Sequence, residues 1–402
     1  MKIDEMLEKY CKNGVRFYKL DEIVDFLNGK GHEKNIVEHG RYIVVNSKFI
    51  STDGDTQKFS NEQICPVYKD DILMVMSDLP NGRALAKCFY VEDDDKYTLN
   101  QRICALRVKD KDLINIRFLY YYLNRNRQLL RYDNGVDQTN LRKDDILNIR
   151  VAVPPLEVQC EIVHILDDFT LLSAELSAEL KARQQQYEYY KNELYSFKDK
   201  DVKYVKLKEI AEIYRGGNFQ KKDFIENGKP CIHYGQIYTK YGKTANKTYT
   251  FVNDTVFEKS KQAGKNDIVM AVTSENIEDV CKCVVWLGNE NIAVSGHTAI
   301  IHTKINARYL GYYFSTLHFF IDKAKLAHGT KVIEVTPSSL NDILIQVPSE
   351  EEQENIASKV EKFEKLCNDI SEGLPAEIEA RQKQYEYYRD KLLTFKELKV
   401  NE

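Results

Sequence analysis

One tyrosine-rich segment occurs twice in this chain of 402 residues. ARQQQYEYYKNEL begins at Ala182, and ARQKQYEYYRDKL begins 198 positions later at Ala380. Over the twenty residues that start at Ala178 and at Ala376, twelve positions are identical. A repeat at nearly half the chain length indicates two copies of one architecture, and it restricts the fold to arrangements that use this segment twice.

The likeness continues more weakly outside this segment. At a shift of 194 the matching pairs are Val153-Pro154 with Val347-Pro348, Gln159 with Gln353, Ile162 with Ile356, and Phe169 with Phe363. The segments between the two tyrosine-rich copies match only at scattered positions. We therefore expect two similar helical parts with one shared role, and two globular parts with related but different roles.

The repeated segment has the pattern of a long helix. Apolar residues recur at helical spacing, and its C-terminal half settles into heptads. We expect these helices to begin near Pro155 and Pro348, and Gly373 and Pro375 to break or kink the second one. Each helix has about 35–40 residues and a length of roughly 50–60 Å at ~1.5 Å per residue.

The heptads predict that the two helices pair antiparallel and offer a further face to a partner. An internal coiled coil without a partner is the alternative. The residues predicted for helix pairing or partner docking are Leu180, Tyr187, Tyr190, Leu194, Phe197, Ile378, Tyr385, Tyr388, Leu392 and Phe395.

The two remaining segments, 1–152 and 199–348, read as mixed globular domains. Short apolar runs with strand character include YIVVN at Tyr42, DILMVM at Asp71 and DIVMAVT at Asp267. Helical runs flank them, as in LYYYLNRNRQLL at Leu119. The predicted fold class is α+β: two mixed α/β-strand domains separated by two long antiparallel coiled-coil helices, with a pseudo-two-fold internal repeat. The predicted helical segments are 153–198 and 349–402.

Composition and motifs exclude several function classes. The N-terminal stretch lacks an apolar signal region, no run is long enough for a bilayer span, and nine scattered cysteines suit reduced thiols, so we expect a cytoplasmic protein. YGKT at Tyr241 lacks the preceding glycine of a phosphate-binding loop, and no dinucleotide fingerprint occurs. No nucleophile motif accompanies His297, and His32, His39 and His233 lack metal spacing. We expect no catalytic residue, metal or cofactor.

Loops rich in groups that contact bases or phosphates remain. Between Val202 and Thr250 the chain carries a net charge of +6, interleaved with aromatic residues. Arg and Lys suit guanine edges, and Asn and Gln suit adenine edges. The candidate DNA-binding residues are Lys30, Arg41, Asn46, Lys48, Arg83, Asn100, Gln101, Arg102, Arg215, Lys221, Lys222, His233, Tyr234, Gln236, Lys240, Lys243, Ser274 and His297.

Two differing α+β domains that alternate with helices ending in ARQQQYEYY and ARQKQYEYY resemble the specificity subunit of type I restriction-modification systems. The resemblance implies that segments 1–152 and 199–348 are target-recognition domains. These would bind a bipartite, asymmetric sequence of double-stranded DNA, and the helices would act as spacer and docking surface. It further implies two methyltransferase subunits as partners and, through them, restriction-translocase subunits. S-adenosylmethionine, ATP and Mg²⁺ would then belong to the partner subunits, and this chain would be non-catalytic.

Two other functions stay open at the level of the sequence. The chain could be an interaction scaffold without a DNA role, which salt-insensitive partner binding would reveal because phosphate contacts are strongly salt-dependent. It could also be a stand-alone DNA-modifying enzyme, which binding of a methyl donor by the isolated chain would reveal.

Overall fold

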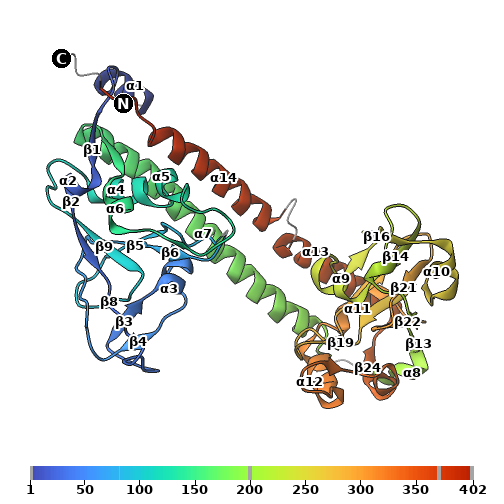
Figure 1. The fold of residues 1–402 in the computed structure, drawn as a ribbon. Coiled ribbons are helices and arrows are strands. Elements are labelled where there is room, and N and C mark those ends of the chain that lie inside the picture. The colour runs from blue at the N-terminus through green and yellow to red at the C-terminus, as the bar shows by residue number, and fades with distance from the viewer. Residues whose placement is uncertain (1–2, 81, 198–201, 369–372, 399–402) are drawn as a thin grey trace. The chain divides into compact units, whose positions relative to one another are not determined.

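The computed structural model describes residues 3–80, 82–197, 202–368 and 373–398, which form two compact units (Figure 1). Unit 1 comprises Met1–Glu175 and Ile378–Glu402, and unit 2 comprises Leu176–Glu377. Helix α7 (Leu156–Leu194) contributes its first half to unit 1 and its second half to unit 2. Each unit therefore combines one globular domain with parts of two helices.

Unit 1 builds its globular domain from short strands and helices. Hydrogen bonds join the strands in the orders β2-β9-β5-β7, β4-β3-β8, β1-β11 and β10-β6. The strands are β1 (Arg16–Lys19), β2 (Val24–Asn28), β3 (Tyr42–Val45), β4 (Phe59–Ser60), β5 (Ile72–Val75), β6 (Ser77–Asp78), β7 (Cys88–Tyr90), β8 (Tyr97–Leu99), β9 (Ile103–Val108), β10 (Thr139–Asn140) and β11 (Arg150–Val153). The short helices are α1 (Ile3–Tyr10), α2 (Leu20–Ile23), α3 (Ser47–Ser51), α4 (Ile116–Leu123), α5 (Arg127–Leu130) and α6 (Lys143–Leu147).

Unit 2 repeats this plan with two further strands, one in each of its larger sheets. The strand orders are β13-β22-β18-β20-β15, β16-β14-β21-β17, β12-β24 and β19-β23. The strands are β12 (Lys203–Lys206), β13 (Ala211–Arg215), β14 (Lys229–Ile232), β15 (Thr244–Ala245), β16 (Thr250–Val252), β17 (Gln262–Ala263), β18 (Ile268–Ala271), β19 (Thr273–Ser274), β20 (Cys283–Trp286), β21 (Ile292–Val294), β22 (Thr298–Thr303), β23 (Ile333–Glu334) and β24 (Leu344–Val347). The helices are α8 (Leu207–Ile210), η1 (Lys221–Asp223), α9 (Tyr234–Thr239), α10 (Asp254–Lys259), α11 (Ala307–Tyr313), α12 (Leu317–Leu326), η2 (Pro337–Asp342) and α13 (Glu350–Asn368).

The central strand of each larger sheet is buried on both faces, which explains its uninterrupted apolar sequence. Because side chains alternate across a strand, Ile72 and Met74 of β5 join the core that includes α4 and α7. Leu73 and Val75 join the core beneath the smaller sheet. Strand β18 divides its side chains between two cores in the same manner. The predicted α+β class is confirmed.

Helix pairing occurs inside each unit. In unit 1, α14 (Leu374–Leu392) runs antiparallel to the first half of α7, and in unit 2 α13 runs antiparallel to the second half (Figure 1). Phe169 stacks on Tyr388 in unit 1, with ring centroids 5.5 Å apart. Phe363 stacks on Tyr190 in unit 2, at 6.0 Å. The two stacks join equivalent residues, so the repeat preserves the helix contact as well as the helices.

Some of the residues predicted for helix pairing lie in the hydrophobic cores, and others lie between the paired helices. Tyr187 and Phe197 are buried in unit 2, and Leu392 is buried in unit 1. Leu194 packs against the core of unit 2, and Tyr385 and Phe395 pack against that of unit 1. Tyr190 and Tyr388 keep one ring face on a phenylalanine and stay 46% and 36% exposed. Leu180 and Ile378 are half-buried.

The predicted second long helix consists of two helices in the described residues, α13 and α14. The expected break at SEGLP falls partly on Ser371 and Glu372, which lie outside the described residues. Pro375 stands at the second position of α14, where its missing N–H breaks no helical hydrogen bond.

A buried glutamine joins each globular domain to its helix. Gln353 accepts a hydrogen bond from the Asn306 N–H at 3.0 Å and donates to the Pro348 carbonyl at 2.8 Å. Gln159 makes the equivalent pair of bonds, from the Asn115 N–H at 2.7 Å and to the Pro154 carbonyl at 2.7 Å. Both side chains are almost fully buried. Each glutamine therefore fixes the start of α4 or α11 against the start of α7 or α13.

Two further observations bear on the sequence predictions. All nine cysteines lie in the described residues and none is in a disulfide, as the scattered spacing predicts. No helix in the described ranges combines the length and apolarity that a bilayer span requires.

Substituting Gln353→Ala should lower the free energy of unfolding of unit 2 by about 2 kcal/mol, because the half-buried Asn306 N–H and Pro348 carbonyl lose their partner. Urea unfolding followed by circular dichroism measures the change. Gln185→Ala, at an exposed position of α7, is the matched control and should shift the curve little. Equal midpoints for the two variants would show that the glutamine is not needed for the join.

Candidate nucleic-acid interface

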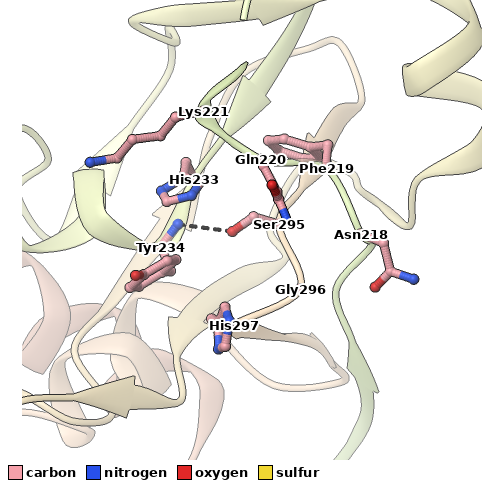
Figure 2. A pocket seen from close by; sticks show the side chains of 9 residues that line it. All are labelled: Asn218, Phe219, Gln220, Lys221, His233, Tyr234, Ser295, Gly296 and His297. Atoms are coloured by element: carbon pink, nitrogen blue, oxygen red, sulfur yellow. Dashed lines mark hydrogen bonds between the residues drawn. The ribbon is translucent and has the colours of Figure 1, made fainter. Parts of the chain in front are cut away.

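Three segments of unit 2 meet at one edge of its globular domain. They are the loop after β13, the N-terminus of α9 and the loop between β21 and β22. Together they line a pocket of about 560 Å³ (Figure 2). The lining residues are Asn218, Phe219, Gln220, Lys221, His233, Tyr234, Ser295, Gly296 and His297. Four of the predicted DNA-binding residues, Lys221, His233, Tyr234 and His297, are thus brought together.

Glycines let the two loops touch through their backbones. The N–H of Gly216 donates to the Thr298 carbonyl at 2.9 Å, and that of Gly217 donates to the Val294 carbonyl at 2.7 Å. A Cβ atom on Gly216 would lie 2.0 Å from the Ser295 carbonyl oxygen, so no larger residue fits there. The loop that contains RGGN and the loop that contains SGH are therefore held together by backbone hydrogen bonds and form one structural element.

His233 lines the pocket and is also the N-cap residue of α9. Its Nδ1 accepts a hydrogen bond from the Gly235 N–H at 3.2 Å, and its own N–H donates to Gln236 at 3.0 Å. The next N–H, of Tyr234, donates to the Ser295 hydroxyl at 2.9 Å, the dashed bond in Figure 2. Burial, with the positive charge of Lys221 as a second cause, lowers the pKa of His233 to about 4. The imidazole is therefore a neutral acceptor.

The exposed rim of this pocket carries groups of the types that contact nucleic acid. The side chains of Lys221 and His297 are exposed, and the His297 ring packs on that of Tyr234 with centroids 5.1 Å apart. Asn218 and Gln220 add exposed amide groups. A lysine cation can bind a phosphate, and aromatic rings and amides can contact bases and their edges. Within the part of the chain that the structure describes, no serine or cysteine side chain forms a hydrogen bond with the His297 ring.

Unit 1 builds the same element from different side chains. Gly29 donates to the Ile103 carbonyl at 2.9 Å, and Lys30 donates to the Leu99 carbonyl at 3.1 Å, as Gly216 and Gly217 do in unit 2. Asn46 is the N-cap of α3 and accepts from the Phe49 N–H at 2.9 Å, which makes it the counterpart of His233. The loop between β8 and β9, with Asn100, Gln101 and Arg102, is the counterpart of Ser295–His297. We call these two sets of segments the loop clusters.

The two loop clusters differ in chemistry. Lys30, Lys48 and Arg102 are exposed in unit 1. Arg102 has a φ of 67°, a left-handed backbone that a non-glycine residue adopts at a cost, and it lies at the tip of its loop. Its counterpart in unit 2 is His297. Equivalent positions with different side chains suit two sites that read different sequences.

The remaining predicted residues have other positions or internal partners. Gln236 is buried and accepts hydrogen bonds from His233 and Thr250. The exposed residues Arg41 and Arg215 form ion pairs with Asp95 and Glu334. Five more predicted residues lie outside the loop segments or on their flanks: Arg83 before β7, Lys222 in η1, Lys240 after α9, Lys243 beside β15 and Ser274 in β19.

Sequence reasoning missed several pocket residues. Asn218, Phe219 and Gln220 stand inside the RGGNFQKK stretch, and Ser295 and Gly296 directly precede His297. The signal that finds them is the repeated glycine-containing pattern after β2 and β13. Within the described ranges, no group of histidine, cysteine and carboxylate residues has the arrangement of a metal site.

Comparison with known proteins agrees with this duplicated architecture. A family model described as the type I restriction modification DNA specificity domain matches residues 12–183 and, a second time, residues 199–380. The chain belongs to this family. The two matches coincide with the two halves of the repeat, and the globular domains are accordingly target-recognition domains.

Individual relatives extend the likeness to sequence and fold. The chain is 36% identical to the EcoR124I/EcoR124II specificity subunit of Escherichia coli, over 60% of each chain. It is 30% identical to a putative type I specificity subunit of Haemophilus influenzae, over 75% of this chain and 77% of that one. A solved chain from a structure of complex assembly in the type I R-M system has a TM-score of 0.63 at 15% identity, with 94% of this chain and 97% of that chain covered.

The depressed pKa of His233 predicts a pH dependence. Its pKa of about 4 lies below the ordinary 6.5, so between these values the folded state binds fewer protons than the unfolded state. Its contribution to the stability of unit 2 should be full above about pH 6.5 and should decrease as the pH falls towards 4. Imidazole NMR should show a neutral His233 at pH 5.5, and a midpoint near 6.5 would contradict this. His233→Asn introduces the residue type that caps α3 in unit 1. This variant should retain the helix cap and remove the pH-dependent contribution of His233 to stability.

Proposed function

We propose that this chain is the sequence-reading, non-catalytic subunit of a type I restriction-modification complex. Its two loop clusters bind the two halves of a bipartite, asymmetric sequence in double-stranded DNA. The observation that carries the proposal is the duplication of one loop cluster with different exposed side chains, Lys30 and Arg102 in one and Lys221 and His297 in the other. One framework with two sets of reading groups suits two different half-sites.

The chemistry of each loop cluster supports duplex DNA as the ligand. Arginine and lysine match the acceptors on guanine, and amides match adenine, in the major groove. Exposed lysines on the same loops match phosphates, so affinity should decrease steeply with salt. The overall formal charge of −4 is no obstacle, because the exposed basic groups are local.

Partner subunits supply what this chain lacks. In the proposed complex two methyltransferase subunits dock on the paired helices, one on each copy of the repeat, and restriction-translocase subunits join through them. S-adenosylmethionine, ATP and Mg²⁺ bind to those subunits. The repeated contact of a phenylalanine with a tyrosine in each unit supports docking of two copies of one partner.

Footprinting of the assembled complex with its methyltransferase partner tests the proposal. Two protected blocks with different sequences, separated by an unread gap, are expected. A contiguous or palindromic protected sequence would contradict the proposal that each of the two domains recognises its own half-site. Protection that is insensitive to salt would contradict phosphate contact.

Single substitutions should separate the two half-sites. Arg102→Ala should weaken DNA binding by the complex about 5- to 150-fold and relax the base preference in one half-site only, since a lost base contact costs about 1–3 kcal/mol. His297→Ala should affect the other half-site only. Each variant is the control for the other. Competition binding with DNA altered in either half-site is the measurement, and a change in the same half-site for both variants would refute the assignment.

The exposed tyrosines of the repeat should contribute to partner docking. Tyr189 and Tyr387 are 62% and 65% exposed, and each packs edge-on against the stacked tyrosine beside it, with centroids 5.4 Å apart in both copies. The double change of Tyr189→Ala and Tyr387→Ala should weaken methyltransferase binding at least tenfold, because rigid exposed tyrosines are typical interface anchors. Calorimetric titration measures this. Unchanged affinity and stoichiometry would exclude this role.

A further inference from the structure

A second pocket of unit 2 brings basic groups together away from the loop cluster. Its volume is about 470 Å³, and it lies where α7, α12 and α13 meet the loops of the globular domain. The residues that line it are Tyr187, Glu188, Lys191, Lys243, Glu278, Lys282, Phe314, Ser315, Thr316, Phe320, Lys323 and Glu364. None of them belongs to the loop cluster, and among them only Lys243 is a candidate DNA-binding residue of the sequence.

Two of its lysines are buried charges. Lys191 is 4% exposed and Lys323 is 5% exposed. Lys191 binds both carboxylate oxygens of Glu188 at 2.8 Å. Lys323 donates to the carbonyls of Glu278 and Val280, at 3.0 and 2.6 Å. Burial lowers the pKa of both amines, and the charge of Lys243 lowers them further. Positive charge thus converges in a low-dielectric place, which is unfavourable without a nearby anion.

Lys243 has no counter-ion among the described residues. It is half-buried, lines the pocket, and lies beyond ion-pair distance of every described carboxylate. Glu364 of α13 also lines the pocket, but its carboxylate accepts the Tyr312 hydroxyl at 2.7 Å, and burial raises its pKa. Among the described residues, Lys243 and Lys323 thus have no carboxylate within ion-pair distance, whereas Lys191 and Lys282 are paired with Glu188 and Asp279.

The equivalent region of unit 1 pairs its basic side chains with a carboxylate of the same chain. Arg125 donates to the Leu85 carbonyl at 3.1 Å, as Lys323 does to the equivalent Val280. Arg389 occupies the position of Lys191, and a carboxylate, Asp390, binds it at 2.9 Å. Asp390 also forms an ion pair with Arg127. In unit 1 a carboxylate from the chain itself sits among the cations.

Unit 2 lacks that carboxylate. The residue equivalent to Asp390 is Asn192, which is neutral, and its amide oxygen accepts the Leu317 N–H at 2.7 Å. The position that carries a carboxylate in unit 1 thus carries a neutral amide in unit 2, directly after Lys191. Glu188 pairs with Lys191, and Lys243 remains without a carboxylate partner.

We propose that the pocket lined by Lys191, Lys243 and Lys323 binds an aspartate or glutamate side chain that the methyltransferase subunit supplies. The inference rests on the proposed function. A protein carboxylate fits better than a DNA backbone, because the exposed Glu188 and Glu278 on the pocket wall would repel a continuous run of phosphates. Tyr187 and Glu188 belong to the repeated helix, so the pocket is continuous with the proposed docking surface.

The experiment compares Lys243→Gln and Lys243→Glu in the full chain with the matched control Lys247→Gln, an exposed lysine of the same unit. Calorimetric titration with the methyltransferase subunit should show about tenfold weaker binding for Lys243→Gln and a larger loss for Lys243→Glu. The control should bind like the parent chain. The melting temperature of free Lys243→Gln should stay level or rise, because repulsion between lysines is relieved.

Three results would overturn the inference. The first is equal partner affinity for the parent chain and both Lys243 variants. The second is a melting temperature lowered by several degrees in free Lys243→Gln, which would make Lys243 a structural group. The third is stabilisation of the parent chain, but not of Lys243→Gln, by inorganic phosphate with partner affinity unchanged, which would assign the pocket to a free anion. Failure of the parent chain to bind the methyltransferase subunit would instead refute the proposed function.

Discussion

A buried glutamine at the start of each repeated helix holds a target-recognition domain to its helical pair, and the other contacts of that unit depend on this join. Gln159 and Gln353 each satisfy one backbone N–H of the domain and one carbonyl before the helix. About two helical turns after each glutamine, an ion pair connects the domain to the same helix, from Arg117 to Asp167 and from Arg308 to Glu361, both at 2.9 Å. An apolar contact could slide along a helix, whereas these directional bonds fix one register.

The repeat separates what must stay constant from what can vary. Buried bonds to backbone atoms, such as those of the two glutamines, tolerate few substitutions because a lost partner leaves polar groups unsatisfied. The loop clusters keep their glycine contacts for the same reason, since Gly29 and Gly216 each lie against the facing loop. The exposed side chains on those loops have no such constraint. Two domains can therefore share one framework and read different DNA.

Sequence reasoning predicted the parts of the fold that repeat or alternate. The heptads gave the helices, and the apolar runs at Ile72 and Ile268 gave the central strands, because burial on both faces leaves an unmistakable pattern. The predicted antiparallel pairing agrees with α14 lying on the first half of α7 and α13 on the second half, but it did not predict individual contacts such as that of Phe169 with Tyr388. The two-part nature of the second helix was signalled only by Gly373 and Pro375.

The candidate site was predicted less completely. Exposed basic residues such as Lys221 and Arg102 were identified from residue type. However, Asn46, His233 and Gln236 have the same base-reading chemistry and are engaged in helix caps or buried hydrogen bonds. Residue type alone does not distinguish a capping amide from an exposed one. The alignment of the two loop clusters does, because it shows which positions carry framework bonds.

The central claim is that two independent readers share one chain. The most direct measurement replaces residues 199–348 by the corresponding domain of another family member, and maps methylated bases by single-molecule sequencing in cells that express the hybrid complex. The account predicts that one half of the methylated sequence changes and the other half stays the same. A change in both halves, or in neither, would contradict it.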